Sequence, residues 1–160
     1  MTSPTFVIHS LAPTDAARLR AQGGRRYTAD ESPGYPCRTC LRDADLGDEL
    51  LLVSHDPFRG PSPYRSASPI FVHAHNCTDG AHIEHVDRVP DQLSRRQLSV
   101  RAFDAEEMMT DASVIDGVDL AALLARFFDD PKVEHVHVHN ATRGCWAATA
   151  LRARSNSVRP

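Results

Sequence analysis

The sequence has no long hydrophobic run, a single lysine (Lys132) and no excess of basic charge. Its longest purely apolar stretch, residues 120–125, is far shorter than the roughly 20 residues that a membrane-spanning helix needs. Met1–Ser10 lacks the basic and apolar regions of a secretory signal, so we expect a cytoplasmic protein. The net charge is −3 at pH 7, and the arginines are spread along the whole chain. From these absences we expect that neither a membrane nor a nucleic acid is a partner of this protein.

The chain contains enough apolar sequence to form a core of its own. Of its 160 residues, 41% are hydrophobic and 24% are charged, which is typical of one globular domain and excludes a disordered chain. We expect a single domain over residues 1–153, followed by a polar C-terminal tail over residues 154–160.

Hydrophobic periodicity predicts a chain in which strands predominate. We expect a short helix over residues 14–22, and an apolar stripe predicts a second helix that Asp116 caps and that ends near residue 130. Strands are predicted over residues 6–8, 49–55, 70–77, 98–103, 108–115, 133–139 and 145–151. Irregular segments are expected over residues 25–36, 56–69 and 78–96. The fold class that follows is α+β, with a mainly antiparallel sheet packed by one or two helices.

Cysteines and histidines form the strongest candidate site. Cys37 and Cys40 are three positions apart, so one tight turn can offer two sulfurs to a metal ion. Cys77 lies in a histidine-rich segment, residues 73–85, and can supply a third ligand. The candidates for the fourth ligand are Cys145 and His73, with His75 and His139 as alternates. In a reducing compartment this set predicts a metal site, with zinc as the fitting ion, or a small-molecule site; the alternative is that the thiols are simply buried.

Alternating histidines mark the predicted strand over residues 133–139. Period two places His135, His137 and His139 on one face, which superficially resembles the histidine-triad nucleotide hydrolases. The Asn-x-Gly and Gly-Gln elements that precede the triad in those enzymes are missing here. An alternative hypothesis is therefore a hydrolase or transferase that uses His137 and His139, with Cys145 as a nucleophile. A solvent-exposed face of histidines is the simpler explanation.

The number of histidines supports a third hypothesis. Protonation of all nine would move the net charge from −3 to +6 (−3 + 9) between about pH 7 and pH 5. The chain could then be a pH-sensitive module that binds a ligand or a partner protein. The proline-rich segment 56–69, with Arg59, Tyr64 and Arg65, is a candidate rim for a binding pocket.

Several motifs together resemble a known bacterial family. In order along the chain they are Pro36-Cys-Arg-Thr-Cys-Leu41, Asp56-Pro-Phe58, Pro63-Tyr64, Pro69-Ile-Phe-Val-His73, Cys77, Val100-Arg-Ala-Phe-Asp104 and Val136-His-Val-His-Asn-Ala-Thr-Arg-Gly-Cys145. The set resembles the domain of unknown function 1203 family over about residues 36–153. The resemblance implies a small, stand-alone, soluble bacterial protein, and it implies no particular activity.

Overall fold

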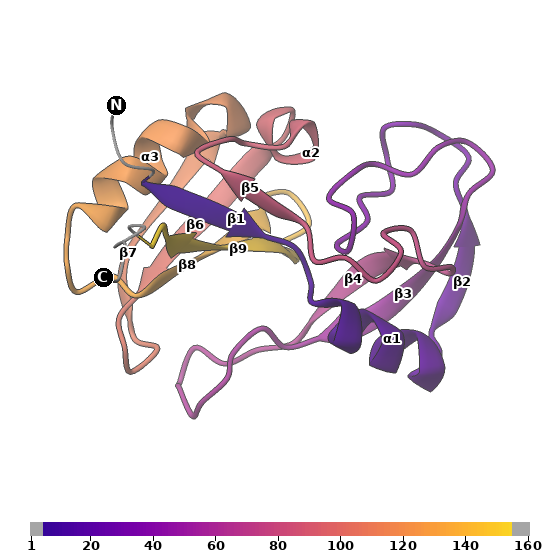
Figure 1. Ribbon diagram of the computed structural model, residues 1–160, viewed down its shortest axis with the longest axis horizontal. Helices are drawn as coiled ribbons and strands as arrows, with labels where there is room; N and C mark the ends of the chain where they lie inside the picture. The colour runs from indigo at the N-terminus through magenta and orange to yellow at the C-terminus, as the bar shows by residue number, and fades with distance from the viewer. Residues whose placement is uncertain (1–4, 155–160) are drawn as a thin grey trace, which may run out of the picture.

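Strands make up most of the regular structure, and they form two antiparallel sheets that lie side by side (Figure 1). The computed structural model describes residues 5–154. The elements are β1 (Phe6–His9), α1 (Pro13–Gln22), β2 (Arg25–Thr28), β3 (Glu49–His55), β4 (Ser68–His73), β5 (Glu84–Val86), α2 (Asp91–Ser94), β6 (Gln97–Phe103), β7 (Met109–Asp116), the 3₁₀ turn η1 (Gly117–Asp119), α3 (Leu120–Phe128), β8 (His135–Asn140) and β9 (Trp146–Arg152). The predicted α+β class is confirmed. Of the tail expected over residues 154–160, all but Arg154 lies outside the described residues.

The larger sheet has six strands in the order β5-β1-β9-β8-β6-β7, and α3 covers one of its faces (Figure 1). The apolar residues of α3 recur at helical spacing, so Leu120, Leu124 and Phe127 all point toward the sheet and are buried. They belong to one cluster with inward side chains of the strands, including Val138 and Ala150. Removal of this apolar surface from water is the main stabilising contribution in this half of the protein.

The smaller sheet has three strands in the order β2-β3-β4, and α1 packs beside it. Leu19 of α1 contributes to a small apolar cluster with Val53 of β3 and Ile70 of β4. Trp146 of β9 also belongs to this cluster, although β9 is a strand of the larger sheet. The two halves therefore meet at Trp146.

Two segments expected to be irregular contain regular elements. Residues 25–28 form β2, an edge strand in which Tyr27 packs edge-on against Phe71. Its polar sequence shows no apolar alternation because most of its side chains are exposed, which is why periodicity missed it. The segment 78–96 contains β5 and α2, both too short to give a periodic signal.

Two predicted boundaries are also corrected. The strand predicted over residues 70–77 ends at His73, because Asn76 turns the chain by accepting hydrogen bonds from the N–H groups of Thr78 and Gly80. Asp116 precedes η1 rather than α3, and its side chain makes no capping hydrogen bond. The helix predicted after it is nevertheless present as α3.

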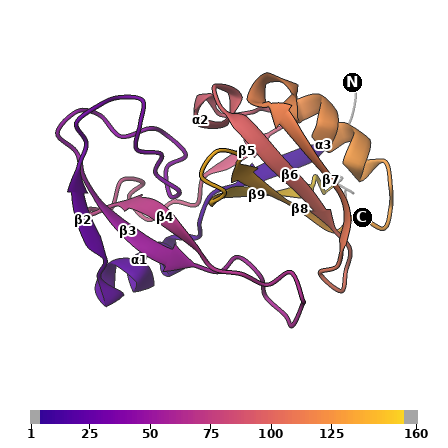
Figure 2. The ribbon, with the colours of Figure 1, turned by 180° about the vertical axis from the view of Figure 1, so that it is seen from behind.

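Two of the three histidines of β8 are buried and His135 is half-buried, which corrects the prediction of a solvent-exposed face. His137 is 2% exposed and His139 is 5% exposed. The segment between β3 and β4 extends toward the turn between β6 and β7 (Figure 2), and its Phe58 packs edge-on against His137. The carboxylate of Glu107 holds this segment in place by accepting hydrogen bonds from the N–H groups of Arg59 and Gly60. The segment thus covers the part of the larger sheet that carries His137.

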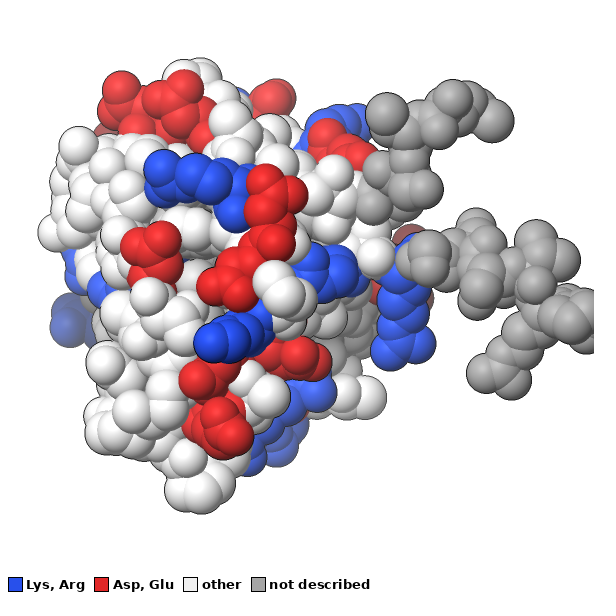
Figure 3. Space-filling model, turned by 90° about the vertical axis from the view of Figure 1, so that its left-hand side faces the viewer, with Lys and Arg blue, Asp and Glu red and all other residues white. Residues whose placement is uncertain are grey.

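Charge is mixed on the side of the molecule that carries α3. Acidic and basic side chains alternate there without forming a continuous patch of one sign (Figure 3). Among residues 5–154, no helix is long and apolar enough to span a membrane.

Candidate metal centre

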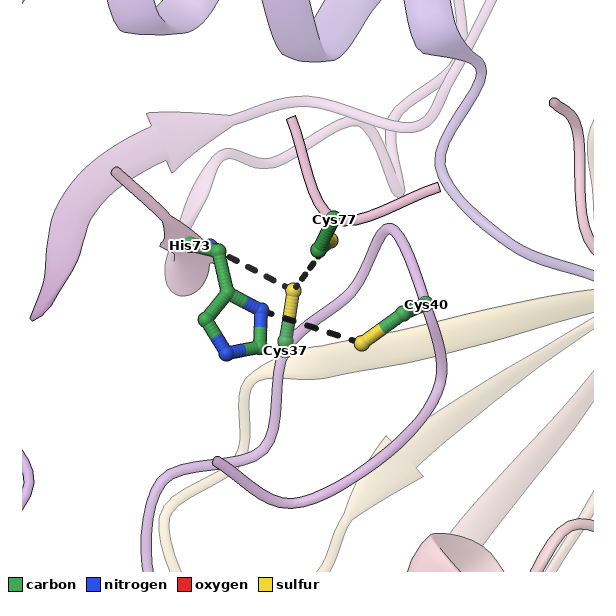
Figure 4. A group of neighbouring side chains, drawn as sticks. All are labelled: Cys37, Cys40, His73 and Cys77. Carbon is green, nitrogen blue, oxygen red and sulfur yellow. Dashed lines mark hydrogen bonds between the residues drawn. The ribbon is translucent and has the colours of Figure 1, made fainter. Parts of the chain in front are cut away.

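Three cysteines and one histidine converge at the end of the smaller sheet (Figure 4). Cys37 and Cys40 come from the turn that precedes β3, His73 is the last residue of β4, and Cys77 lies in the turn that follows it. One potential ligand atom from each side chain lies within 4.8 Å of all the others. The sulfurs of Cys37 and Cys77 are 3.9 Å apart, and the sulfur of Cys40 is 3.8 Å from Nδ1 of His73. This cluster could hold a metal ion.

The Cys37–Cys40 turn is fixed by the chain around it. The N–H of Cys37 donates to the carbonyl of Arg42, and the N–H of Arg38 donates to the carbonyl of Phe71 in β4. The next residue, Leu41, adopts a left-handed conformation with φ of 57°. Its side chain is buried in the apolar cluster of the larger sheet, which offsets the cost of that conformation.

Backbone and hydroxyl donors also surround the sulfurs. The N–H of His73 donates to the sulfur of Cys37 at 3.3 Å. The hydroxyl of Thr39 lies 2.9 Å from the sulfur of Cys37 and 3.0 Å from that of Cys77. Such donors stabilise negative charge on sulfur, which is the form that binds metal.

A carboxylate orients the histidine of the cluster. Nε2 of His73 lies 3.1 Å from Oδ2 of Asp48, so that nitrogen carries the proton and donates to Asp48. In the neutral imidazole, the form that binds metal, Nδ1 then carries the lone pair, and it faces Cys40 (Figure 4). Metal-binding histidines usually have a partner of this kind on their other nitrogen.

The electrostatics of the cluster favour a thiolate at Cys37 and oppose one at Cys40. Hydrogen bonding to Cys37 and Cys77 outweighs burial and raises the pKa of His73 to about 10. Burial opposes ionisation of Cys37, but hydrogen bonding to Cys40, Cys77 and His73 holds the pKa of Cys37 well below its usual value. Hydrogen bonding to Cys37 and Cys77 raises the pKa of Cys40. These shifts favour negative charge on Cys37 and positive charge on His73.

Arg38 connects the cluster to the larger sheet. Its guanidinium is buried, and it donates from Nε to the carbonyl of Trp146 at 2.8 Å and from Nη2 to the sulfur of Cys145 at 3.2 Å. From α2, the side-chain amide of Gln92 donates to the carbonyl of Cys37. The turn that carries two of the cysteines is thus bonded to both halves of the molecule.

The sequence also matches a family model, described as a protein of unknown function (DUF1203), over residues 34–152. This match covers most of the chain, and it includes all four residues of the cluster. The chain belongs to the DUF1203 family. No curated protein and no solved structure match the chain.

The other predicted ligands of this DUF1203 protein lie outside the cluster. Cys145 is bonded to Arg38, and His139 lies on β8 with its Nδ1–H donating to the carbonyl of Gly144. The ring of His75 packs beside His73, with 5.0 Å between the ring centroids, but His75 is not part of the converging set. Of the candidates for the fourth ligand, only His73 is brought into the described cluster.

The residues of the enzymatic hypothesis lie on the larger sheet. Burial lowers the pKa of His137 to about 3 and that of His139 to about 4, so both imidazoles are neutral near pH 7. Nδ1 of His137 has no hydrogen-bond partner among residues 5–154. Phe58 covers His137, and Cys145 is engaged by Arg38.

Asp48 and Arg38 are among the residues that support the cluster and that the sequence did not predict for it. Neither carries a local signal, since each acts through a partner that is distant in the chain.

A cavity of about 240 Å³ lies next to the cluster, between α1 and the turn after β4, and Thr39 and Arg20 contribute to its lining. Arg20 also donates to the carbonyl of His73.

Proposed function

We propose that this DUF1203 protein binds one Zn²⁺ ion through Cys37, Cys40, His73 and Cys77, and that the ion is a structural cross-link within the smaller half, between the Cys37–Cys40 turn and the end of β4. The observation that carries the proposal is the convergence of four buried or half-buried ligand atoms within 4.8 Å. Three thiolates and one imidazole are a common ligand set of structural zinc sites.

The distances within the cluster fit a tetrahedral zinc ion. Bond lengths of about 2.3 Å to sulfur and about 2.0 Å to nitrogen give edges of about 3.8 Å between two sulfurs and about 3.5 Å between sulfur and nitrogen. The separation of Cys37 and Cys77 is 3.9 Å, and that of Cys40 and His73 is 3.8 Å. Only small side-chain movements are needed to complete the tetrahedron.

Charge supports the same ligand set. Zn²⁺ with three thiolates and a neutral histidine carries one net negative charge, which would be costly in a buried place without a counter-ion. Arg38 is buried next to the cluster, and the attraction of Cys37 and Cys145 for its guanidinium partly offsets the lowering of its pKa by burial. Arg38 can therefore balance the charge of the loaded site.

The site is closed, which favours a structural role over a catalytic one. All four ligands come from the protein, and Cys37, Cys40 and His73 are less than 7% exposed. A catalytic zinc ion needs an open position for water or substrate. Loading requires loss of thiol protons, so zinc binding is expected to be coupled to folding of this region.

Elemental analysis tests the proposal directly. We would purify the protein without chelator and without a histidine tag, next to the double variant Cys37→Ser, Cys40→Ser. The matched control is Cys145→Ser, which removes a neighbouring thiol that lies outside the cluster.

About one zinc per chain in the wild type and in Cys145→Ser, with loss of zinc in the double variant, is the expected result. Wild-type protein that carries no metal and gains none on incubation with Zn²⁺ would contradict the proposal. Full zinc content in the double variant would contradict it as well.

A further inference from the structure

A second group of potential ligands lies at the β5 edge of the larger sheet, where β1 ends. Nδ1 of His9 is 3.3 Å from Nε2 of His82 and 3.4 Å from Oε1 of Glu84. The three atoms all lie within 4.8 Å of one another. The group is accessible, because His9 is half-buried and the other two residues are exposed.

Strand pairing brings these residues together. His9 ends β1 and Glu84 begins β5, and the two are directly paired across the antiparallel ladder, so their side chains share a face. His82 precedes Glu84 by two positions, and the N–H of Ser10 donates to the carbonyl of the residue between them, Ile83. Extended backbone of period two places His82 and Glu84 on the same side.

The register of these strands is held at both ends. At the far end of the pair, the carboxylate of Asp87 accepts hydrogen bonds from the N–H groups of Thr5 and Phe6. At the near end, the hydroxyl of Ser10 accepts from the N–H of Ile83. The ligand geometry therefore comes from the backbone and needs no ion to assemble it.

The observed distances match the edges of a metal polyhedron. Bonds of about 2.0 to 2.1 Å to nitrogen and oxygen in a tetrahedral site give edges of about 3.3 Å, and the two shortest separations here are 3.3 and 3.4 Å. A simple hydrogen bond between two neutral imidazoles would explain the first separation. It does not explain why the carboxylate of Glu84 approaches the same nitrogen of His9.

We propose that His9, His82 and Glu84 form a second metal site, which binds a divalent transition-metal ion such as Zn²⁺ and leaves a coordination position open. Two imidazoles and one carboxylate suit zinc and the neighbouring transition metals better than calcium or magnesium. The fourth position is free for water or for an anionic group of another molecule. This site differs from the Cys37–Cys77 cluster in its ligands, its exposure and its open coordination, and it does not depend on the proposed function.

Cobalt binding can test this site separately from the cysteine cluster. Zinc-treated protein is dialysed against Co²⁺, and bound cobalt is measured by elemental analysis together with its absorption spectrum. Cobalt bound to thiolates gives charge-transfer absorption, whereas cobalt bound to two imidazoles and a carboxylate does not. The variants are His82→Gln and Glu84→Gln, which change exposed side chains, and the matched control is His85→Gln. His85 is the next histidine on β5, and its Nδ1 lies beside Arg88 instead.

We expect the wild type to bind one cobalt ion per chain without thiolate absorption. In His82→Gln and Glu84→Gln, cobalt binding should be at least about tenfold weaker, because loss of a metal ligand weakens binding at least as much as loss of a residue that hydrogen-bonds to a ligand. His85→Gln should bind as the wild type does. Absence of thiolate-free cobalt in the wild type would overturn the proposal, and so would equal binding in all variants. If the cysteine cluster proves not to bind metal, the spectrum and these variants still decide the second site.

Discussion

The two sheets of this protein differ in what holds them together. In the six-stranded sheet, α3 packs on one face over a large apolar cluster, and the β3–β4 segment covers His137 on the other face. The three-stranded sheet has only two small clusters, around Leu19 and Leu50, and its edge strand β2 is largely exposed. The cluster of Cys37, Cys40, His73 and Cys77 lies in this half, which has less apolar packing.

This difference indicates how a chain of this length can stabilise a second sheet. The larger half buries more apolar side chains than the smaller half, so an additional constraint would stabilise the smaller half more. A bound ion would supply that constraint where Cys37, Cys40, His73 and Cys77 meet. Loss of the metal is therefore expected to destabilise mainly the smaller half, and truncation of the apolar core mainly the larger half.

Removal of zinc is expected to have the largest effect and to act on the smaller half. Hydrogen-exchange protection of β3 and β4 amides, such as those of Leu51 and Ile70, should fall by more than about a thousandfold in the variant Cys37→Ser, Cys40→Ser, which corresponds to more than about 4 kcal/mol. Amides of β8, such as that of Val138, should change by less than about tenfold. Equal loss of protection in both sheets would contradict the division into two halves.

Truncation in the apolar core should produce the opposite pattern. Leu124 is fully buried in the cluster between α3 and the larger sheet. Leu124→Ala is expected to lower the free energy of unfolding by about 3 kcal/mol, through lost burial and the cavity that remains. Denaturant unfolding measures the loss, while zinc content should stay at the wild-type value. Ala122→Gly, at an exposed position of the same helix, is the control for helix propensity alone.

How far the sequence predicts these features depends on whether the signal is local. The spacing of Cys37 and Cys40 and the apolar stripe of α3 lie within one short segment, so the cysteine turn and the helix were recognised. The choice between His73 and Cys145 as the fourth ligand depends on the pairing of β4 with β3, which no local pattern encodes. The burial of His137 depends on a segment that Glu107 anchors from 47 residues away.

The partner of His73 offers a graded test of the proposed zinc site. Asp48→Ala removes the carboxylate that orients the imidazole through Nε2, and we expect zinc affinity to fall by about 10- to 100-fold. Competition with a chromophoric chelator measures the affinity. Asp45→Ala is the matched control, since it changes an exposed carboxylate in the same turn and leaves the His73 contact intact. Equal affinities in the two variants would show that Asp48 does not support the site.

The smallest expected effect is an acid sensitivity of the larger half that does not depend on metal. Burial lowers the pKa of His137 to about 3, whereas the same imidazole in the unfolded chain titrates near its usual value of about 6.5. Between these two pH values the unfolded chain binds a proton that the folded chain does not. Stability is therefore fully present above about pH 6.5 and falls as the pH is lowered, by up to about 1.4 kcal/mol per pH unit.

Comparison with His137→Leu isolates this contribution. Between pH 7 and pH 5.5 the wild type should lose about 1 kcal/mol more unfolding free energy than His137→Leu, measured by urea unfolding with zinc in excess. Both proteins share the cysteine cluster, so acid effects on zinc binding cancel in the difference. An equal loss of unfolding free energy in both proteins would mean that His137 has the same pKa in the folded and unfolded chains. Its burial under Phe58 would then contribute nothing to the pH dependence of stability. The predicted difference would show that a buried polar side chain, rather than the zinc site, makes the better-packed sheet sensitive to acid.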